Sequence, residues 1–272
     1  MIELTEAQIT DLAELQQLCI DLQSELVIVG AIAYQQYFPD DERHTSDIDT
    51  VVALDLEDFD ELKQRLLAIG WSNVAAREHR WVSQRGTLLD LIPAGKKLRE
   101  AKSITWPQSQ FRMSLVGFDH VFSDAQLVTL GGRLPIRVIP PVVLMLLKIV
   151  VFLDDQSRRA KDLSDSRSLM SRYEADSDRI FSDAVLDAKL SDFSLANAYL
   201  LGLDLRSICT EEEVEVVRTF LSTVSDETKP AWLGFVRAAP RLGERSEEIA
   251  QLQFNVFRKD LKESKQYPTE EK

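Results

Sequence analysis

Cysteine and histidine are scarce in this sequence, with two cysteines and three histidines among 272 residues. Cys19 and Cys209 lie far apart, and the scattered histidines show no ligand spacing, so a disulfide framework or a structural zinc site is not expected. Long apolar runs are also missing, because the most apolar stretch, residues 141–153, is too short to cross a bilayer and contains a lysine. The N-terminus lacks the basic and apolar regions of a secretory signal. These absences predict a cytoplasmic protein with no membrane partner.

Basic residues are fewer than acidic residues in this sequence. The chain has 32 Lys and Arg residues against 45 Asp and Glu residues, which gives a formal net charge of −13 at pH 7. This balance argues against a broad basic surface for nucleic acid, although a local basic patch can still meet one RNA or one nucleotide. The proportion of hydrophobic residues, 44%, is that of a globular protein, and the length fits two domains or one domain with an extension.

The hydrophobic pattern changes near Pro140, from short apolar strands mixed with helices to helices alone. The sequence therefore predicts an α/β (α+β) fold, with a small mixed β-sheet and flanking helices in residues 1–139, a helical domain in 140–261 and a charged tail in 262–272. The predicted strands are 26–29, 48–54, 74–82, 87–92 and a hairpin over 128–139. After a first helix capped near Thr5, the predicted helices are 31–38, 56–69, 142–153, 158–173, 180–189, 211–224 and 249–261.

An acidic run opens the second predicted strand, where residues 43–49 read Arg-His-Thr-Ser-Asp-Ile-Asp. Alternate side chains of an extended chain share a face, so we expect Arg43, Thr45, Asp47 and Asp49 on one side. Two carboxylates at i and i+2 supply oxygen ligands for Mg²⁺ or Mn²⁺, and substrate phosphates can complete the coordination. Taken alone, the pair is weak evidence, because two exposed acids at the end of a strand are the commoner origin of such a pattern.

Asp90 interrupts an otherwise apolar predicted strand. A buried carboxylate is costly unless a cation or hydrogen bonds compensate it, so this strand either lies at a sheet edge with Asp90 facing water or brings Asp90 to a cationic site. Pairing beside the acidic strand would give the three carboxylates that a two-metal phosphoryl-transfer site needs. On the predicted hairpin that carries Asp90, Arg77, Arg80 and Arg85 flank Trp81 and are candidates to pair with a base or phosphate, with ordinary hairpin packing as the alternative.

Gly30 and Ala31 lie where the first predicted strand enters a helix. The small side chains would let backbone N–H groups and the helix N-terminus approach phosphates. Such turns are common, but this one precedes the acidic strand, which is the order expected of a phosphate-binding turn.

In this order, the glycine turn, the acidic strand and Asp90 resemble the DNA-polymerase-β-like nucleotidyltransferase superfamily. Lys148, in an apolar helix, and residues 158–165 (Arg-Arg-Ala-Lys-Asp-Leu-Ser-Asp) are similar to the lysine helix and acidic segment of the AbiEii-type nucleotidyltransferase toxins. The resemblance covers about residues 25–170. It implies that a nucleoside triphosphate (NTP) binds between the sheet and the helical half.

The resemblance also implies roles for individual residues. Asp47 and Asp49 would bind the metal, with Asp90 as the third carboxylate, and Lys148 would contact phosphate. By its sequence alone, Lys148 also fits a surface lysine whose stem covers the helix. The residues assigned to the nucleotide are Gly30, Ala31, Arg43, Thr45, Lys148 and Asp162.

The activity that the resemblance implies is transfer of a nucleoside monophosphate from an NTP to a hydroxyl of an RNA such as tRNA, by a toxin with a cognate antitoxin. Two alternatives stay open. One is a small-molecule nucleotidyltransferase of the antibiotic-modifying kind. The other is a non-catalytic nucleotide-binding descendant, suggested by Ala31, which stands where the family has a second glycine or a hydroxyl residue.

Overall fold

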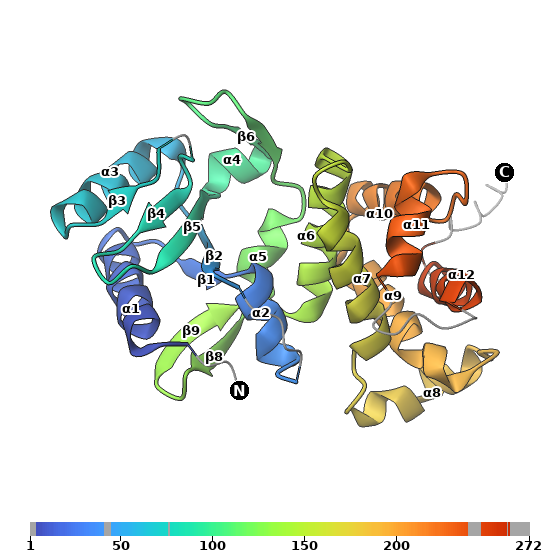
Figure 1. The fold of residues 1–272 in the computed structure, drawn as a ribbon. Coiled ribbons are helices and arrows are strands. Elements are labelled where there is room, and N and C mark those ends of the chain that lie inside the picture. Colours follow the sequence, from blue (N-terminus) through green and yellow to red (C-terminus); the bar gives the residue numbers. More distant parts are fainter. Residues whose placement is uncertain (1–3, 41–44, 76, 239–245, 260, 262–272) are drawn as a thin grey trace, which may run out of the picture. The chain divides into compact units, whose positions relative to one another are not determined.

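A computed structural model describes residues 4–40, 45–75, 77–238, 246–259 and 261 of the chain. The chain divides into two compact units, Met1–Asp154 and Asp155–Lys272. The first unit contains the β-sheet, and the second is helical (Figure 1).

The first unit is built on a seven-stranded mixed sheet with the strand order β3-β4-β5-β2-β1-β9-β8. Strand β1 runs parallel to β9 and β2 runs parallel to β5, while the other neighbours are antiparallel. The strands are β1 (Leu26–Ile28), β2 (Asp47–Val52), β3 (Ser72–Asn73), β4 (Arg80–Val82), β5 (Leu88–Pro93), β8 (Gln126–Leu130) and β9 (Leu134–Val138), with β6 (Ser103–Thr105) and β7 (Arg112–Ser114) as a separate pair. The predicted mixed sheet is confirmed.

Helices cover both faces of this sheet. In Figure 1, α1 and α3 lie together on one side, whereas α2 and α6 lie on the other. Helix α1 begins with a capping box in which Thr5 and Gln8 satisfy each other's backbone N–H groups. The helices of this unit are α1 (Glu6–Asp21), α2 (Gly30–Tyr37), α3 (Leu56–Ala68), α4 (Lys96–Glu100), α5 (Phe118–Ser123) and α6 (Pro141–Asp154).

Successive side chains of β5 point to opposite faces of the sheet, so only one set of them faces α1. Leu89 and Leu91 are fully buried, and Thr87, on the same face, donates a hydrogen bond to Asp11 of α1. Asp90 therefore points to the opposite face, away from α1. This is also the face of β2 that carries the predicted acidic residues, because Asp90 and Asp49 are directly paired.

The second unit consists of short and medium-length helices. Gly202 lies where α9 meets α12, and a Cβ atom there would come within 2.1 Å of the Phe257 carbonyl oxygen, so only glycine permits this approach. The helices are α7 (Ala160–Arg172), α8 (Asp183–Asp187), α9 (Ala196–Ile208), α10 (Glu211–Val224), α11 (Pro230–Arg237) and α12 (Ser246–Phe257), with 3₁₀ turns η1 (Asp178–Phe181) and η2 (Phe193–Leu195).

The division between the units falls after α6, whereas the change in the sequence pattern falls at Pro140. The difference has a physical reason: α6 is apolar over most of its surface and packs against α2, α5 and β7. By its contacts it belongs with the sheet. None of the helices in the described ranges has both the length and the apolar character needed to span a membrane.

Candidate functional site

Three charged side chains, Asp49, Asp90 and Arg80, form a row across three neighbouring strands. We call these three residues and Asp47 the strand site. Asp49 of β2 lies directly opposite Asp90 of β5, and Asp90 lies directly opposite Arg80 of β4. Directly paired residues project from the same face and lie within reach of each other. The predicted pairing of the Asp90 strand with the acidic strand is thus confirmed. The alternative of an edge strand with Asp90 in water is wrong, since β5 lies inside the sheet and Asp90 is 8% exposed.

Arg80 joins two of the carboxylates. Its Nε donates to Asp90 Oδ1 at 2.7 Å and its Nη2 donates to Asp90 Oδ2 at 2.8 Å, which makes a bidentate pair. The same Nη2 donates to Asp47 Oδ2. These contacts, chiefly the hydrogen bonds to Asp90, raise the pKa of Arg80, so the guanidinium stays charged. The buried carboxylate thus has the cationic partner that its apolar strand requires.

Thr45 holds the first aspartate of the acidic strand. Its Oγ1 lies 2.9 Å from Asp47 Oδ1 and 3.0 Å from the Asp47 carbonyl oxygen, and donates to both acceptors. The hydroxyl therefore fixes the Asp47 side chain relative to its own backbone at the start of β2. This agrees with the expected placement of Thr45 and Asp47 together.

Asp49 lies against the glycine turn. Gly30 has a φ of +64°, and a Cβ atom at this position would lie 2.0 Å from Asp49 Oδ2, so both backbone and space demand glycine. The Val29 N–H donates to the Asp49 carbonyl at 3.0 Å, which ties the end of β1 to β2. Helix α2 starts at Gly30 without a side-chain cap from Val29, and Ala31 is buried in its first turn. The structure thus brings the glycine turn and the second aspartate together.

The chemistry of these side chains fits a hard divalent cation. Asp47, Asp49 and Asp90 offer carboxylate oxygens, the ligands that Mg²⁺ and Mn²⁺ prefer, and the absence of a Cβ at Gly30 lets the Asp49 carboxylate lie against the turn. Among the described residues, no three carboxylate, imidazole or thiol groups converge closely enough to form a metal cluster by themselves. The Arg80 guanidinium bridges Asp47 and Asp90 instead. The metal-binding role of the three aspartates stays a prediction.

The remaining predicted residues lie elsewhere. Lys148 is half-buried on α6, which packs against α2, the helix that starts at Gly30. Asp162 is buried on α7 of the second unit, where its carbonyl accepts a hydrogen bond from Ser166. Arg43 lies outside the described residues. The strand site is therefore composed of side chains of the first unit.

Two neighbours of Asp90 were not predicted from the sequence to contact it. His79 Nε2 lies 3.9 Å from Asp90 Oδ2, and the imidazole contacts the Trp106 ring at 5.6 Å between centroids. Arg80 was a candidate for phosphate or base pairing but not for binding Asp90. Both residues lie where the chain enters β4, so the hairpin register, which periodicity alone does not give, is the signal that identifies them.

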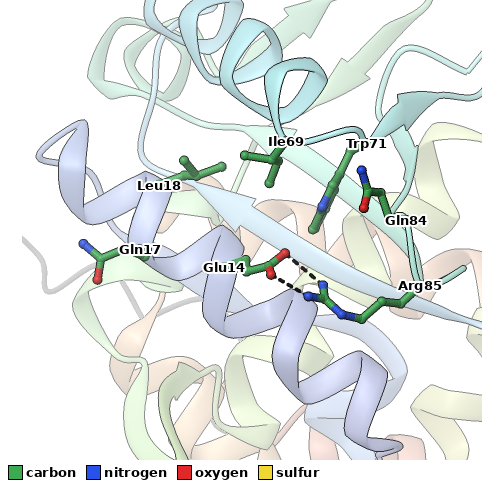
Figure 2. Close-up of a pocket in the computed structure, with 7 residues that line it drawn as sticks. All are labelled: Glu14, Gln17, Leu18, Ile69, Trp71, Gln84 and Arg85. Carbon is green, nitrogen blue, oxygen red and sulfur yellow. Dashed lines mark hydrogen bonds and ion pairs between the residues drawn. The ribbon is translucent and has the colours of Figure 1, made fainter.

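A separate pocket lies near the opposite face of the sheet. Figure 2 shows it between α1, the end of α3 and the β4–β5 turn, with the ion pair of Glu14 and Arg85 on one side. Its volume is about 290 Å³, and Gln17, Leu18, Ile69, Trp71 and Gln84 complete its lining. Arg85, a candidate to pair with a base or phosphate, lines it, but none of the residues that the resemblance assigns to catalysis or nucleotide binding does, so we do not place the reaction there.

A mixed sheet with strand aspartates beside a glycine turn is the arrangement that the resemblance to nucleotidyltransferases led us to expect. The family comparison is more specific: the model of the family described as "Nucleotidyl transferase AbiEii toxin, Type IV TA system" matches residues 15–261, and the chain belongs to this family. The resemblance seen in the sequence is confirmed. Membership identifies the protein as a nucleotidyltransferase and implies a nucleotide substrate and a cognate antitoxin.

Several solved structures match this chain at low sequence identity. The antibiotic-resistance factor ANT(2'')-Ia is 15% identical with a TM-score of 0.39, over 60% of this chain and 83% of that chain. A nucleotidyltransferase-like antigen from Paracoccidioides brasiliensis is 19% identical with a TM-score of 0.40, over 73% and 90%. JHP933 from Helicobacter pylori is 13% identical with a TM-score of 0.37, over 95% of both chains. Comparison with curated proteins found no match. The assignment rests on the family model.

Proposed function

We propose that this protein transfers a nucleoside monophosphate from an NTP to a hydroxyl of an RNA, with tRNA as the favoured acceptor, and releases pyrophosphate with the help of Mg²⁺ or Mn²⁺. The observation that carries the proposal is the strand site, in which Asp49 lies against the glycine turn and beside Asp90. Carboxylates next to a turn that can approach phosphates are suited to a metal-bound triphosphate. The RNA acceptor is inferred from the toxin family.

Each group of the strand site has a chemical task in this reaction. Asp47 and Asp49 would hold the cation, which when bound supplies positive charge at the phosphates and eases ionisation of the attacking hydroxyl. The hydroxyl oxygen forms a bond to the α-phosphorus while the bond from that phosphorus to the leaving pyrophosphate breaks. Asp90 is the candidate to accept the hydroxyl proton. Lys148 would neutralise charge that moves to pyrophosphate.

The direct test uses the purified protein with each radiolabelled NTP, Mg²⁺ and either total RNA or a panel of aminoglycosides. We expect label to pass from one NTP to RNA and pyrophosphate to be released. Asp49→Asn should remove this activity because it removes one anionic ligand without changing side-chain shape. Asp60→Asn, on the exposed surface of α3, is the matched control and should behave as the parent protein.

The alternatives give different results in the same experiment. Label on an aminoglycoside and none on RNA would indicate a small-molecule nucleotidyltransferase. Binding of an NTP without pyrophosphate release under any condition would indicate a non-catalytic descendant. Activity that survives in Asp49→Asn would reject the strand site as the place of transfer.

A further inference from the structure

We propose that Arg80 is a built-in counter-ion, which neutralises Asp47 and Asp90 in the metal-free protein and moves to the phosphates when the metal–triphosphate complex binds. A divalent cation alone then binds weakly, and the triphosphate makes its binding strong. This inference rests on the proposed function, since it assumes that the strand site binds a metal-bound triphosphate. Arg80 is thereby a positioning and coupling residue of that site.

The geometry leaves no oxygen of the two carboxylates without a donor. Arg80 donates to both oxygens of Asp90 and to Oδ2 of Asp47, and Thr45 donates to Oδ1 of Asp47. A cation that takes Asp47 or Asp90 as a ligand must therefore displace at least one of these donors. The charged fork of Arg80, with three contacts, is the principal competitor.

Burial strengthens this competition. The side chains of Arg80, Asp47 and Asp90 are 18%, 25% and 12% exposed, so water screens their attraction only in part. Without a cation, two carboxylates on paired strands would repel each other. Arg80 offsets that repulsion in the metal-free protein and holds the two aspartates in position.

A phosphate gives the displaced arginine a second partner. The planar guanidinium matches phosphate oxygens as well as carboxylate oxygens, and both form bidentate pairs with it. When a divalent cation neutralises the aspartates, Arg80 can turn to the triphosphate without leaving a buried charge unpaired. Metal and triphosphate binding are then coupled, because each removes the penalty that the other would meet alone.

The test measures metal binding, with no turnover. Mn²⁺ alone, and then the preformed complex of Mn²⁺ with inorganic tripolyphosphate, are titrated into the parent protein and into Arg80→Gln by calorimetry. We expect Arg80→Gln to bind Mn²⁺ alone about tenfold more tightly, because the arginine no longer competes for the carboxylates. We expect it to bind the tripolyphosphate complex about tenfold more weakly, because a charge-assisted contact to phosphate is lost. The two opposite shifts distinguish coupling from a purely structural role, which would weaken both.

Two further variants serve as controls. Arg133→Gln removes the same charge from the exposed β8–β9 turn, where Arg133 pairs with Glu6 of α1, so both affinities should stay within about twofold of the parent values, as expected for a screened surface charge. Arg80→Lys keeps the charge but loses the fork, and should shift both affinities in the same directions by smaller factors. It also serves if Arg80→Gln fails to fold, which circular dichroism would show.

The outcomes separate this inference from the proposed function. Unchanged or weaker binding of Mn²⁺ alone in Arg80→Gln, or in Arg80→Lys if that is the folded variant, overturns the inference even if nucleotide transfer to RNA occurs. Opposite shifts in a protein that transfers no nucleotide support the inference and overturn the proposed function. Failure of the parent protein to bind Mn²⁺ in either form overturns both.

Discussion

Gly30 shows how a residue without a side chain can make room for a neighbouring carboxylate. Its positive φ favours glycine. An added Cβ would also clash with the Asp49 carboxylate, because it would lie 2.0 Å from Oδ2. We predict that Gly30→Ala lowers nucleotide transfer by about 100-fold, because displacing a reacting group by about 1 Å has an effect of that order. Rates measured at saturating NTP and Mg²⁺ test this directly.

Gly132→Ala is the matched control for that prediction. Gly132 has a φ of +75°, but nothing lies within 4 Å of the added Cβ, so the variant shares the backbone penalty without the clash. Both variants should lose about 1 kcal/mol or more of unfolding free energy in urea melts, as is usual for a non-glycine residue in the left-handed region. Equal activities in the two variants would show that the Asp49 contact has no role in transfer.

At the scale of the residue, much of the strand site follows from the sequence. The positions of Asp47 and Asp49 follow from strand alternation, and the adjacency of Asp90 follows from pairing of the predicted strands. The arginine that binds Asp90 does not follow, because it depends on which of Arg77, Arg80 and Arg85 the hairpin register brings opposite Asp90. Periodicity does not fix that register.

The elements show the same contrast between local and long-range information. The hairpin at 128–139 is confirmed as β8 and β9, joined at two glycines of positive φ, and the helix at 211–224 is confirmed as α10. The strand predicted from Val74 starts only at Arg80, because the Asn73 side chain hydrogen-bonds to the carbonyls of Arg77, Glu78 and Arg80, which positions these residues for a turn into β4. Helix α9 was missed since it is apolar on most sides and contains Gly202.

Helix α1 is fastened to the β4–β5 turn by a fully buried carboxylate. Asp11 accepts hydrogen bonds from Ser83 at 2.6 Å, Thr87 at 2.5 Å and Arg85 at 2.7 Å. We predict that Asp11→Ala reduces the unfolding free energy by about 3–5 kcal/mol, the usual effect of breaking a buried ionic network. Glu14→Ala is the control: it removes an exposed partner of the same Arg85 and should change urea melts little.

Lys148 of α6 can be tested for a role in phosphate binding as opposed to packing. Lys148→Met keeps the apolar stem, so the melting temperature should change little, whereas loss of a phosphate contact should lower transfer by about 100-fold or more. Rates and thermal melts of the same preparation measure both effects. Full activity with a much lower melting temperature would assign the lysine to packing alone.

The whole molecule contains buried thiols and phenols that disfavour alkaline conditions. Burial raises the pKa of Cys19 and Cys209 to about 12 from the usual 9.0, and that of Tyr37 to about 12 from 10.0. A raised folded pKa means that stability is complete below the unfolded pKa and is lost as the pH rises toward the folded pKa. We predict that the unfolding free energy falls between pH 9 and 12.

Urea melts at pH 8 and at several values up to about pH 11 measure how the unfolding free energy changes with pH. This slope arises from groups that lose their proton at a lower pH in the unfolded chain than in the folded protein. Replacing both cysteines by alanine removes two such groups, so the double variant should lose less stability over the same pH interval, whatever its starting value. An unchanged slope would mean that the thiols do not contribute to the alkaline transition.

The row of Asp49, Asp90 and Arg80 also constrains how this sheet can evolve. If a mutation neutralises Asp90, Arg80 becomes a half-buried cation with one carboxylate partner fewer. If a mutation removes Arg80, the buried Asp90 and the half-buried Asp47 lose the cation between them. Neither single step is neutral, so descendants should replace the two positions together or keep both. A lineage that has abandoned catalysis would then carry a double exchange on two adjacent strands, which sequencing of divergent homologues can recognise without an assay.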